Sequence, residues 1–99
     1  MAQYDVYAIS DSNDLFLKLQ SNRIQGLTTK IGAPLVRKLP SDRPILKLQP
    51  EFFIAGQPYI MLTQYILSVP ASDLRERLAN LKDFDYRITS AIDLLFHGI

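Results

Sequence analysis

The hydrophobic pattern of the first two-thirds of the chain predicts β-strands. Leu15, Leu17 and Leu19 recur at every second position, which is typical of a half-buried strand. Residues 4–9 show a weaker alternation of polar and apolar side chains, and the turn-forming residues 11–14 separate the two segments. These two segments therefore predict a β-hairpin.

Two further regions predict strands. Residues 30–36 have strand character, but Pro34 lacks the N–H group that a strand interior needs, so we place this strand at a sheet edge or a bulge. Residues 52–54 and 59–67 flank residues 55–58, which carry the glycine and proline of a turn. This region predicts a second hairpin.

The last third predicts helical structure. Leucines recur over residues 74–81 at spacings of four and three, which indicates a helical turn or a short helix. Asp83 can cap a second helix that runs to Phe96, and Gly98 is a natural stop signal. The apolar stripe of this second helix consists of Phe84, Ile88, Ala91, Ile92, Leu95 and Ile99. Strands followed by a helix predict a mainly β, α+β fold, an antiparallel sheet or small barrel with a packed helix.

Composition bounds the possible classes of protein. The 99 residues, 47% of them hydrophobic, predict a single domain over residues 1–99 with a small core, to which a dimer interface would add burial. The absence of cysteine excludes disulfides, thiolate metal sites and cysteine nucleophiles. Residues 1–9 do not resemble a signal peptide, and no apolar run reaches the ~18 residues of a membrane span. We therefore expect a cytoplasmic protein without a membrane partner.

Charge and reactive side chains point away from catalysis. The net charge is +1, and lysines and arginines are scattered, with Arg37-Lys38 as the one basic doublet, so we expect no sequence-specific DNA binding by the chain alone. The single histidine, His97, lies four residues after Asp93, but this pair alone does not make a catalytic constellation. We expect no enzymatic activity, no metal and no cofactor.

The C-terminal end of the predicted helix is apolar on almost every side. Leu94 and Phe96 lie off the apolar stripe, and chain ends are usually frayed and polar. Two interpretations remain open. The end is buried in a dimer interface or under the sheet, or it is an exposed recognition tip. Both hold if the tip lies beside a dimer axis.

Residues 90–99 resemble the C-terminus of CcdB toxins, which end in an Ala-Ile-Asn-Leu-Met-Phe-Trp-Gly-Ile-like run. Residues 19–22, 33–35 and the stretch from 61–63 through 68–70 agree with this family in order and spacing, and the total length also matches. The resemblance implies a homodimer with an SH3-like barrel-type sheet and a long C-terminal helix. It also implies binding to the A subunit of DNA gyrase, trapping of the cleaved gyrase–DNA complex, and neutralisation by an antitoxin with a disordered C-terminal segment.

The resemblance assigns roles to residues by their position. It implies that Tyr59 contacts the antitoxin, and we expect Leu95 at or near the two-fold axis of the dimer. For Tyr4, Tyr7 and Ile24, simple sheet packing is an equally good explanation. The gyrase-facing set is Tyr4, Tyr7, Ser21, Ile24, Asp85, Asp93, His97, Gly98 and Ile99.

The sequence departs from the family at two of these positions and at the position before Ile24. His97 stands where the family has a tryptophan that stacks on gyrase arginines, Asp93 replaces an asparagine, and Arg23 replaces an isoleucine. We therefore expect weaker gyrase binding than in a tryptophan-bearing relative. Two alternatives are a MazF-like endoribonuclease toxin, which shares this fold, and a degenerate member that binds an antitoxin without killing.

Overall fold

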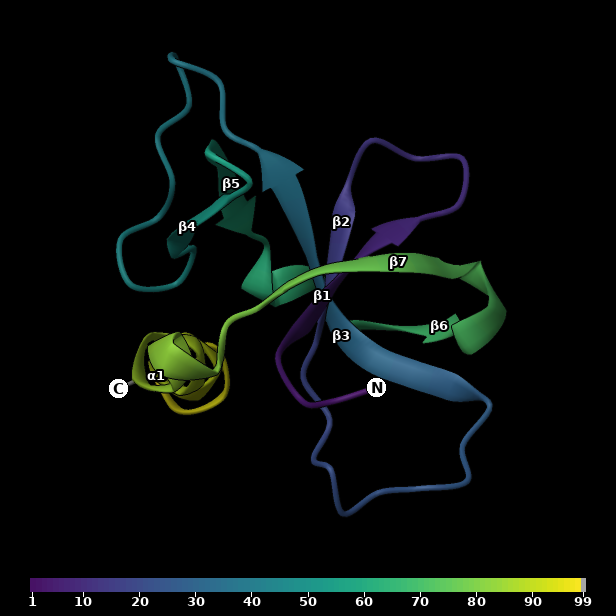
Figure 1. Ribbon diagram of the computed structural model, residues 1–99. Coiled ribbons are helices and arrows are strands. Elements are labelled where there is room, and N and C mark those ends of the chain that lie inside the picture. Colours follow the sequence, from purple (N-terminus) through teal and green to yellow (C-terminus); the bar gives the residue numbers. More distant parts are fainter. Residues whose placement is uncertain (99) are drawn as a thin grey trace.

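The computed structural model describes residues 1–98. Its seven strands form one antiparallel sheet in the order β4-β5-β3-β2-β1-β7, and β6 also pairs with β3. The sheet curls into a half-barrel, and helix α1 lies at one end of it (Figure 1). The predicted α+β, SH3-like barrel fold is therefore confirmed. The elements are β1 (Asp5–Ile9), β2 (Leu15–Lys18), β3 (Thr29–Arg37), β4 (Glu51–Ile54), β5 (Gln57–Met61), η1 (Thr63–Tyr65), β6 (Leu67–Pro70), η2 (Ala71–Asp73), β7 (Leu74–Asn80), η3 (Lys82–Phe84) and α1 (Asp85–His97).

Both predicted hairpins are present. Strands β1 and β2 pair with Val6 opposite Leu17, and strands β4 and β5 pair with Phe52 opposite Tyr59. The β4–β5 turn has two residues, Ala55 and Gly56, with φ angles of 52° and 79°. Two successive left-handed residues are the geometry that matches the twist of a tight hairpin, so the turn fixes the register of this pair.

The expected edge position of the strand around Pro34 is wrong, because β3 lies in the middle of the sheet. Its first half, Thr29–Gly32, pairs with β6, and its second half, Leu35–Arg37, pairs with β5. The Pro34 carbonyl accepts the Leu62 N–H at 3.0 Å. The N–H and C=O groups of one strand residue point to the same side of the strand. The donor that Pro34 lacks would therefore point into the gap between β5 and β6, where no ladder bond is lost.

The helical prediction for residues 74–81 is also wrong. Residues Leu74–Asn80 form strand β7, which pairs with β1 and carries two irregularities in register. Leu74 is buried, whereas Leu78 is 43% exposed. The leucine spacing suits a helix, but the unpaired edge of β1 offers backbone hydrogen bonds, and this tertiary pairing overrides the local pattern.

Helix α1 keeps the middle of the expected stripe, since Ile88 and Ala91 are buried and Ile92 is half-buried. The stripe's ends differ, because Phe84 lies in η3 and Leu95 is 36% exposed. Asp83 lies in η3, and Phe84 occupies the N-cap position without a side-chain cap, so the predicted capping role of Asp83 is wrong. The helix ends at His97, one residue beyond the expected end. Gly98 has a φ of 71°, and its N–H donates to the Leu94 carbonyl at 3.0 Å, which confirms it as the stop. None of the helices within residues 1–98 is long and apolar enough to cross a membrane.

The core lies between the curled sheet and α1. Ile88 and Ala91 of the helix are fully buried against residues such as Val6 and Leu35, with Ile92 packed at the margin. Gly32 marks the tightest approach within the sheet, because a Cβ atom there would lie 2.1 Å from the Leu17 carbonyl oxygen and 2.5 Å from the Phe16 ring. This position requires glycine for lack of space.

Candidate functional site

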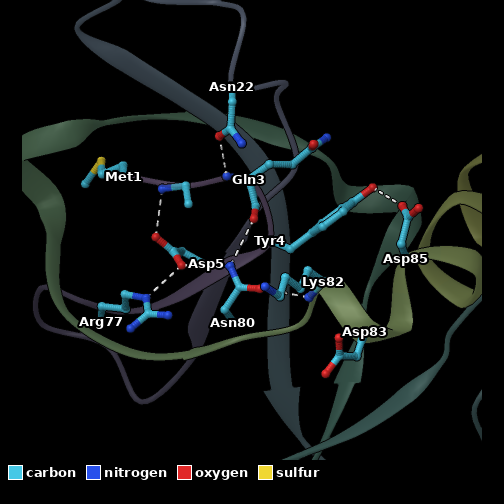
Figure 2. A pocket seen from close by; sticks show the side chains of 11 residues that line it. Met1, Gln3, Tyr4, Asp5, Asn22, Arg77, Asn80, Lys82, Asp83 and Asp85 are labelled. Carbon is cyan, nitrogen blue, oxygen red and sulfur yellow. Dashed lines mark hydrogen bonds and ion pairs between the residues drawn. The ribbon is translucent and has the colours of Figure 1, made fainter.

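A buried carboxylate organises the N-terminal end of the sheet. Asp5 is 3% exposed, and each of its two carboxylate oxygens accepts two hydrogen bonds. Oδ1 accepts Arg77 Nε at 2.7 Å and Asn80 Nδ2 at 2.9 Å, while Oδ2 accepts the Ala2 N–H at 2.8 Å and the Tyr7 hydroxyl at 2.9 Å. Figure 2 shows Arg77 and Asn80 converging on Asp5. The network joins β1 to β7.

These bonds fix the charge state of the cluster. Burial alone would raise the pKa of Asp5, but the hydrogen bonds from Asn80, Arg77, Ala2 and Tyr7 outweigh it and hold the pKa well below its usual range. Burial and the hydrogen bond to Asp5 raise the pKa of Tyr7 to about 12. A negative Asp5 beside a neutral Tyr7 is the stable arrangement at neutral pH.

A second bond joins the start of β1 to the start of α1. The Tyr4 hydroxyl donates to the Asp85 carboxylate, and Figure 2 shows the tyrosine ring pointing along the pocket toward that carboxylate. Burial and this hydrogen bond raise the pKa of Tyr4 to about 12. Tyr4 has a φ of 70°, a left-handed conformation that costs a non-glycine residue free energy and is typical of functional or tightly constrained sites.

The C-terminal end of α1 carries exposed apolar surface. Phe96 is 67% exposed and Leu95 is 36% exposed, while His97 is also exposed. Gly98 follows in its left-handed conformation and is open to solvent. Ile99, the last residue of the expected gyrase-facing set, lies outside the described residues. The described part of this end is a small apolar tip on a rigid helix.

The other expected site residues lie on three separate elements. Ile24 is 47% exposed, in the loop that follows β2, where its N–H donates to the Ser21 carbonyl at 3.1 Å. Asp93 is exposed on α1. Tyr59 is partly buried on β5, with the Arg37 guanidinium 6.0 Å from its ring centroid.

Four of the nine residues in the expected gyrase-facing set line one of two separate hollows. Tyr4 and Asp85 line the polar pocket of Figure 2, next to Asn22. Asp93 and His97 line a second hollow on another side of α1. Tyr7 is 5% exposed and its hydroxyl is bonded to Asp5, so it lies beneath the surface.

The described residues do not form a metal centre. No group of three or more histidine, cysteine, aspartate or glutamate side chains within residues 1–98 is close enough to hold an ion. His97 makes no hydrogen bond with Asp93 among the contacts of this region, although the two are four residues apart on the same helix face.

Sequence reasoning missed the Asp5 network and the second hollow. Asp5 stands between Tyr4 and Val6, which are both buried. A single acidic residue within an apolar strand was the one sequence signal that could have indicated a buried carboxylate. Its partners Arg77 and Asn80 lie more than 70 residues away in sequence, and no local pattern connects them. The second hollow depends on a loop whose path the sequence does not reveal.

Three solved structures with the same fold are two mycobacterial endoribonucleases and a toxin from Mycobacterium tuberculosis. A mycobacterial endoribonuclease in complex with its cognate antitoxin has a TM-score of 0.77 at 13% identity, covering 97% of this chain and 94% of that one. An endoribonuclease from a mycobacterial species has a TM-score of 0.75 at 13% identity, with coverages of 97% and 90%. The Mycobacterium tuberculosis toxin MazF-mt6 has a TM-score of 0.73 at 18% identity, with coverages of 93% and 94%. At these identities the likeness concerns the fold.

The sequence itself matches a different family. Residues 3–98 match the CcdB protein family, so the match begins before β1 and includes the whole of α1 and its glycine stop. The elements that carry the Asp5 network, the Tyr4–Asp85 bond and the apolar helix end are all within it. This protein therefore belongs to the CcdB family of toxins from toxin–antitoxin pairs.

Proposed function

We propose that this protein is a non-enzymatic toxin that binds the A subunit of DNA gyrase and traps the cleaved gyrase–DNA complex. In this proposal a cognate antitoxin with a disordered C-terminal segment neutralises it. Membership of the CcdB family supports the toxin assignment. The observation that carries the gyrase assignment is the exposed end of α1, where Phe96, His97 and Gly98 present an apolar tip.

The tip is suited to binding a protein because its last helical turn is closed by a hydrogen bond and its apolar side chains are exposed. The Gly98 N–H closes the helix on the Leu94 carbonyl, so the last turn is ordered before any partner arrives. Phe96 offers a large apolar surface, and aromatic side chains dominate the binding energy of many interfaces. His97 and Ile99 complete the proposed contact surface.

The remaining members of the gyrase-facing set act in two ways in this proposal. Ser21, Ile24, Asp85 and Asp93 contact the partner directly, since each has surface to offer. Tyr4 and Tyr7 act from beneath, because their rings are buried and their hydroxyls hold Asp85 and Asp5. Positioning of this kind would keep α1 at a fixed angle to the sheet.

We also propose that the active form is a homodimer with Leu95 near its two-fold axis. Five of the apolar side chains that a monomer leaves 36–47% exposed lie in the loop after β2, the first half of β3, the start of β6 and the helix end. A second copy covering these residues would bury the surface that a small core lacks. These residues are Ile24, Leu27, Ile31, Leu67 and Leu95.

Tyr59 is the proposed contact for the antitoxin. It lies on β5 opposite Phe52, in the hairpin at the end of the sheet, where an extended segment can approach. The structural neighbour solved with its cognate antitoxin supports an antitoxin partner for this fold. Tyr59→Ala should weaken the antitoxin complex, measured by calorimetry, more than it weakens growth arrest; equal losses would indicate misfolding instead.

The alternative function is RNA cleavage, and the observation in its favour is the likeness to the mycobacterial endoribonucleases. Such a ribonuclease would need basic and polar catalytic groups clustered on the sheet. The one histidine of the chain is on α1. Among residues 1–98 the one ion pair joins the exposed Arg77 to the buried Asp5, whose carboxylate oxygens each already accept two hydrogen bonds. Membership of the CcdB family therefore carries more weight.

One experiment separates the two functions. The purified protein is incubated with gyrase, supercoiled plasmid and ATP, and in parallel with total RNA. Linear DNA after protease treatment, with intact RNA, is the expected result. Cleaved RNA without linear DNA would identify a ribonuclease, and the gyrase proposal would then be wrong.

A further inference from the structure

The first part of the loop between β3 and β4 carries an excess of positive charge. It contains Arg37, Lys38 and Arg43, with Asp42 as the one acidic residue. Three cations against one carboxylate give residues 37–43 a net charge of +2, although the whole chain has +1. In Figure 1 the chain leaves the end of β3, rises beyond β5 and descends beside β4 toward α1. We call Arg37, Lys38 and Arg43 the basic turn.

The sheet beside the basic turn supplies no carboxylate to balance this charge. Strand β5 pairs with the end of β3, where Arg37 lies opposite Tyr59. Residues 52–72, which include all of β5, contain no charged side chain. Among residues 1–98 the only ion pair joins Arg77 to Asp5, so none of the three cations of the basic turn is in an ion pair.

Both arginines are held in place by neutral acceptors. Arg37 Nη2 donates to the Gln57 amide oxygen, and the Arg37 guanidinium carbon lies 6.0 Å from the centre of the Tyr59 ring. Arg43 Nη1 donates to two backbone carbonyl oxygens of its own loop, at 3.3 Å and 3.1 Å. These bonds orient the two guanidinium groups without cancelling their charge, and they leave most of the five N–H donors of each group for a ligand.

The basic turn is also ordered by its own backbone. Asp42 Oδ2 accepts the Leu39 N–H at 2.7 Å, and the Asp42 N–H donates to the Leu39 carbonyl at 3.0 Å. The Lys38 N–H donates to a β5 carbonyl at 2.9 Å, which extends the sheet up to this turn. The Arg43 guanidinium thereby returns to within hydrogen-bond distance of Pro40, two residues after Lys38. The three cations therefore form one cluster before any ligand arrives.

The rest of the loop is neutral and leads to the helix end. From residue 44 the loop lines the second hollow together with His97 of α1. Around this hollow the cations Lys47 and Arg87 are balanced by the carboxylates Glu51 and Asp93. The excess charge of the loop is therefore confined to the basic turn. A macromolecule seated on the helix end has this loop at its side.

An ordered cluster of arginines without carboxylate partners suits a chain of phosphates. A guanidinium group presents paired donors that match two oxygens of one phosphate. Duplex DNA carries one negative charge per about 1.7 Å of its axis, so it meets all three cations at once and in any sequence. An acidic protein segment offers fewer charges over the same length, and it has to place each carboxylate individually.

We propose that the basic turn contacts the phosphate backbone of the DNA in the complex that the toxin traps. This inference rests on the proposed function, since gyrase supplies that DNA. The contact is independent of base sequence. It adds an anchor on nucleic acid to the protein contact made by the end of α1.

The first test measures DNA binding by the full chain without gyrase. A short fluorescein-labelled duplex is titrated with the protein, and anisotropy gives the affinity at a series of low salt concentrations. Three phosphate contacts predict a slope of about −2.7 for the logarithm of the affinity against the logarithm of the salt concentration. A wild type whose affinity does not depend on salt would contradict the proposal.

Matched double variants locate the contact. Arg37→Gln with Arg43→Gln should reduce the slope to about −0.9, because two phosphate contacts are lost. Arg75→Gln with Lys82→Gln removes the same charge from exposed positions outside the basic turn, so the slope should stay near −2.7. A thermal transition verifies that each variant is folded. Equal slopes in the two double variants would overturn the proposal.

A charge-preserving variant and two competitors identify what is recognised. Arg37→Lys with Arg43→Lys keeps both charges and should retain the salt dependence of the wild type. Unlabelled duplex should displace the probe, and poly-glutamate at the same concentration of charge should displace it far less. Equal displacement by poly-glutamate would assign the basic turn to an acidic protein. Tighter binding of single-stranded RNA than of the duplex would assign it to RNA, and either result overturns the proposal.

The second test uses gyrase with and without DNA. Arg37→Gln with Arg43→Gln should bind DNA-free gyrase A as the wild type does, but should trap about tenfold less cleaved complex, because two phosphate contacts are lost. An equal loss of binding to DNA-free gyrase A would show that the basic turn contacts protein, and the proposal would be wrong. A wild type that traps no cleaved complex but keeps the salt slope of the basic turn would contradict the proposed function and leave the phosphate contact standing.

Discussion

The Tyr4 hydroxyl donates a hydrogen bond to the carboxylate of Asp85, which is the first residue of α1. The bond spans 81 residues in sequence and joins the first strand to the helix that carries the apolar tip. Asp85 also lies in the first helical turn, where a negative charge interacts favourably with the helix dipole. The Tyr4 side chain therefore orients α1 and also binds the negative charge of Asp85 at the N-terminus of that helix.

Tyr4→Phe removes this bond and keeps the buried ring. We expect the free energy of unfolding to fall by about 1 kcal/mol, since a hydrogen bond to a charged but partly exposed group is lost. Urea denaturation measures the change. Tyr65→Phe is the matched control, because Tyr65 is 60% exposed and should change stability by less than about 0.5 kcal/mol. Equal effects of the two substitutions would show that the Tyr4–Asp85 bond does not stabilise the fold.

Asp5→Asn tests the buried carboxylate network. The amide places an NH₂ group against donors that now face a carboxylate oxygen, so we expect a loss of about 2–3 kcal/mol at pH 7. The folded pKa of Asp5 lies below the value of 3.8 that the side chain has when unperturbed. The ionised Asp5 therefore adds to the free energy of unfolding above about pH 4, and this addition is lost as the pH falls further.

The measurement is denaturant unfolding of the wild type and Asp5→Asn from pH 7 to pH 2. The stability difference should stay constant down to about pH 4 and shrink below it. A difference that persists unchanged at pH 2 would mean that Asp5 does not carry its charge into the folded state.

Gly32→Ala tests the close approach of β2 and β3. The new Cβ would lie 2.1 Å from a backbone oxygen, which cannot move without shifting the strand, so we expect a loss of about 3 kcal/mol or an insoluble protein. Gly26→Ala is the control, because open space surrounds it and only its φ of 81° opposes the substitution. That variant should lose about 1 kcal/mol. Thermal unfolding of the two variants compares the steric clash at Gly32 with the backbone strain at Gly26. Similar losses of stability would contradict the steric explanation.

The hydrophobic pattern predicted the elements whose side-chain arrangement is set locally. The residues around Gly56 identified the β4–β5 turn, and alternating leucines identified β2, because each depends on neighbours in sequence. The expectation that β2 is half-buried was wrong, because Phe16 and Lys18 on its other face are buried as well. The pattern failed at Leu74, where a distant strand supplies the hydrogen bonds, and at Pro34, where two partner strands meet. Pairing between distant segments decides these cases.

The candidate site follows the same division. The apolar helix end could be predicted, since Phe96 and Leu94 depart from a local stripe. The bond from Tyr4 to Asp85 and the saturation of Asp5 could not, because their partners meet only in the folded chain. The second hollow likewise depends on the path of the loop before β4, which no local pattern reveals.

Leu95→Glu tests the proposed homodimer. Leu95 retains 36% exposure in the single chain, so a charged side chain is tolerated there without a partner but is unfavourable at a two-fold axis, where it meets its own copy. Sedimentation at micromolar concentration should give a dimer for the wild type and a monomer for Leu95→Glu. A wild type that sediments only as a monomer would contradict the proposed homodimer.

The central claim is that the end of α1 is the recognition element for gyrase. The direct measurement is the gyrase cleavage assay, with supercoiled plasmid and ATP, on the full chain, on His97→Trp and on a chain that stops at Phe96. The buried helix residues Ile88 and Ala91 remain in the truncated chain, so its fold and its antitoxin binding should survive. We predict that the full chain yields linear DNA after protease treatment, that His97→Trp yields more because the larger ring stacks better on arginine, and that the truncated chain yields none. Linear DNA from the truncated chain at the level of the full chain would contradict the claim.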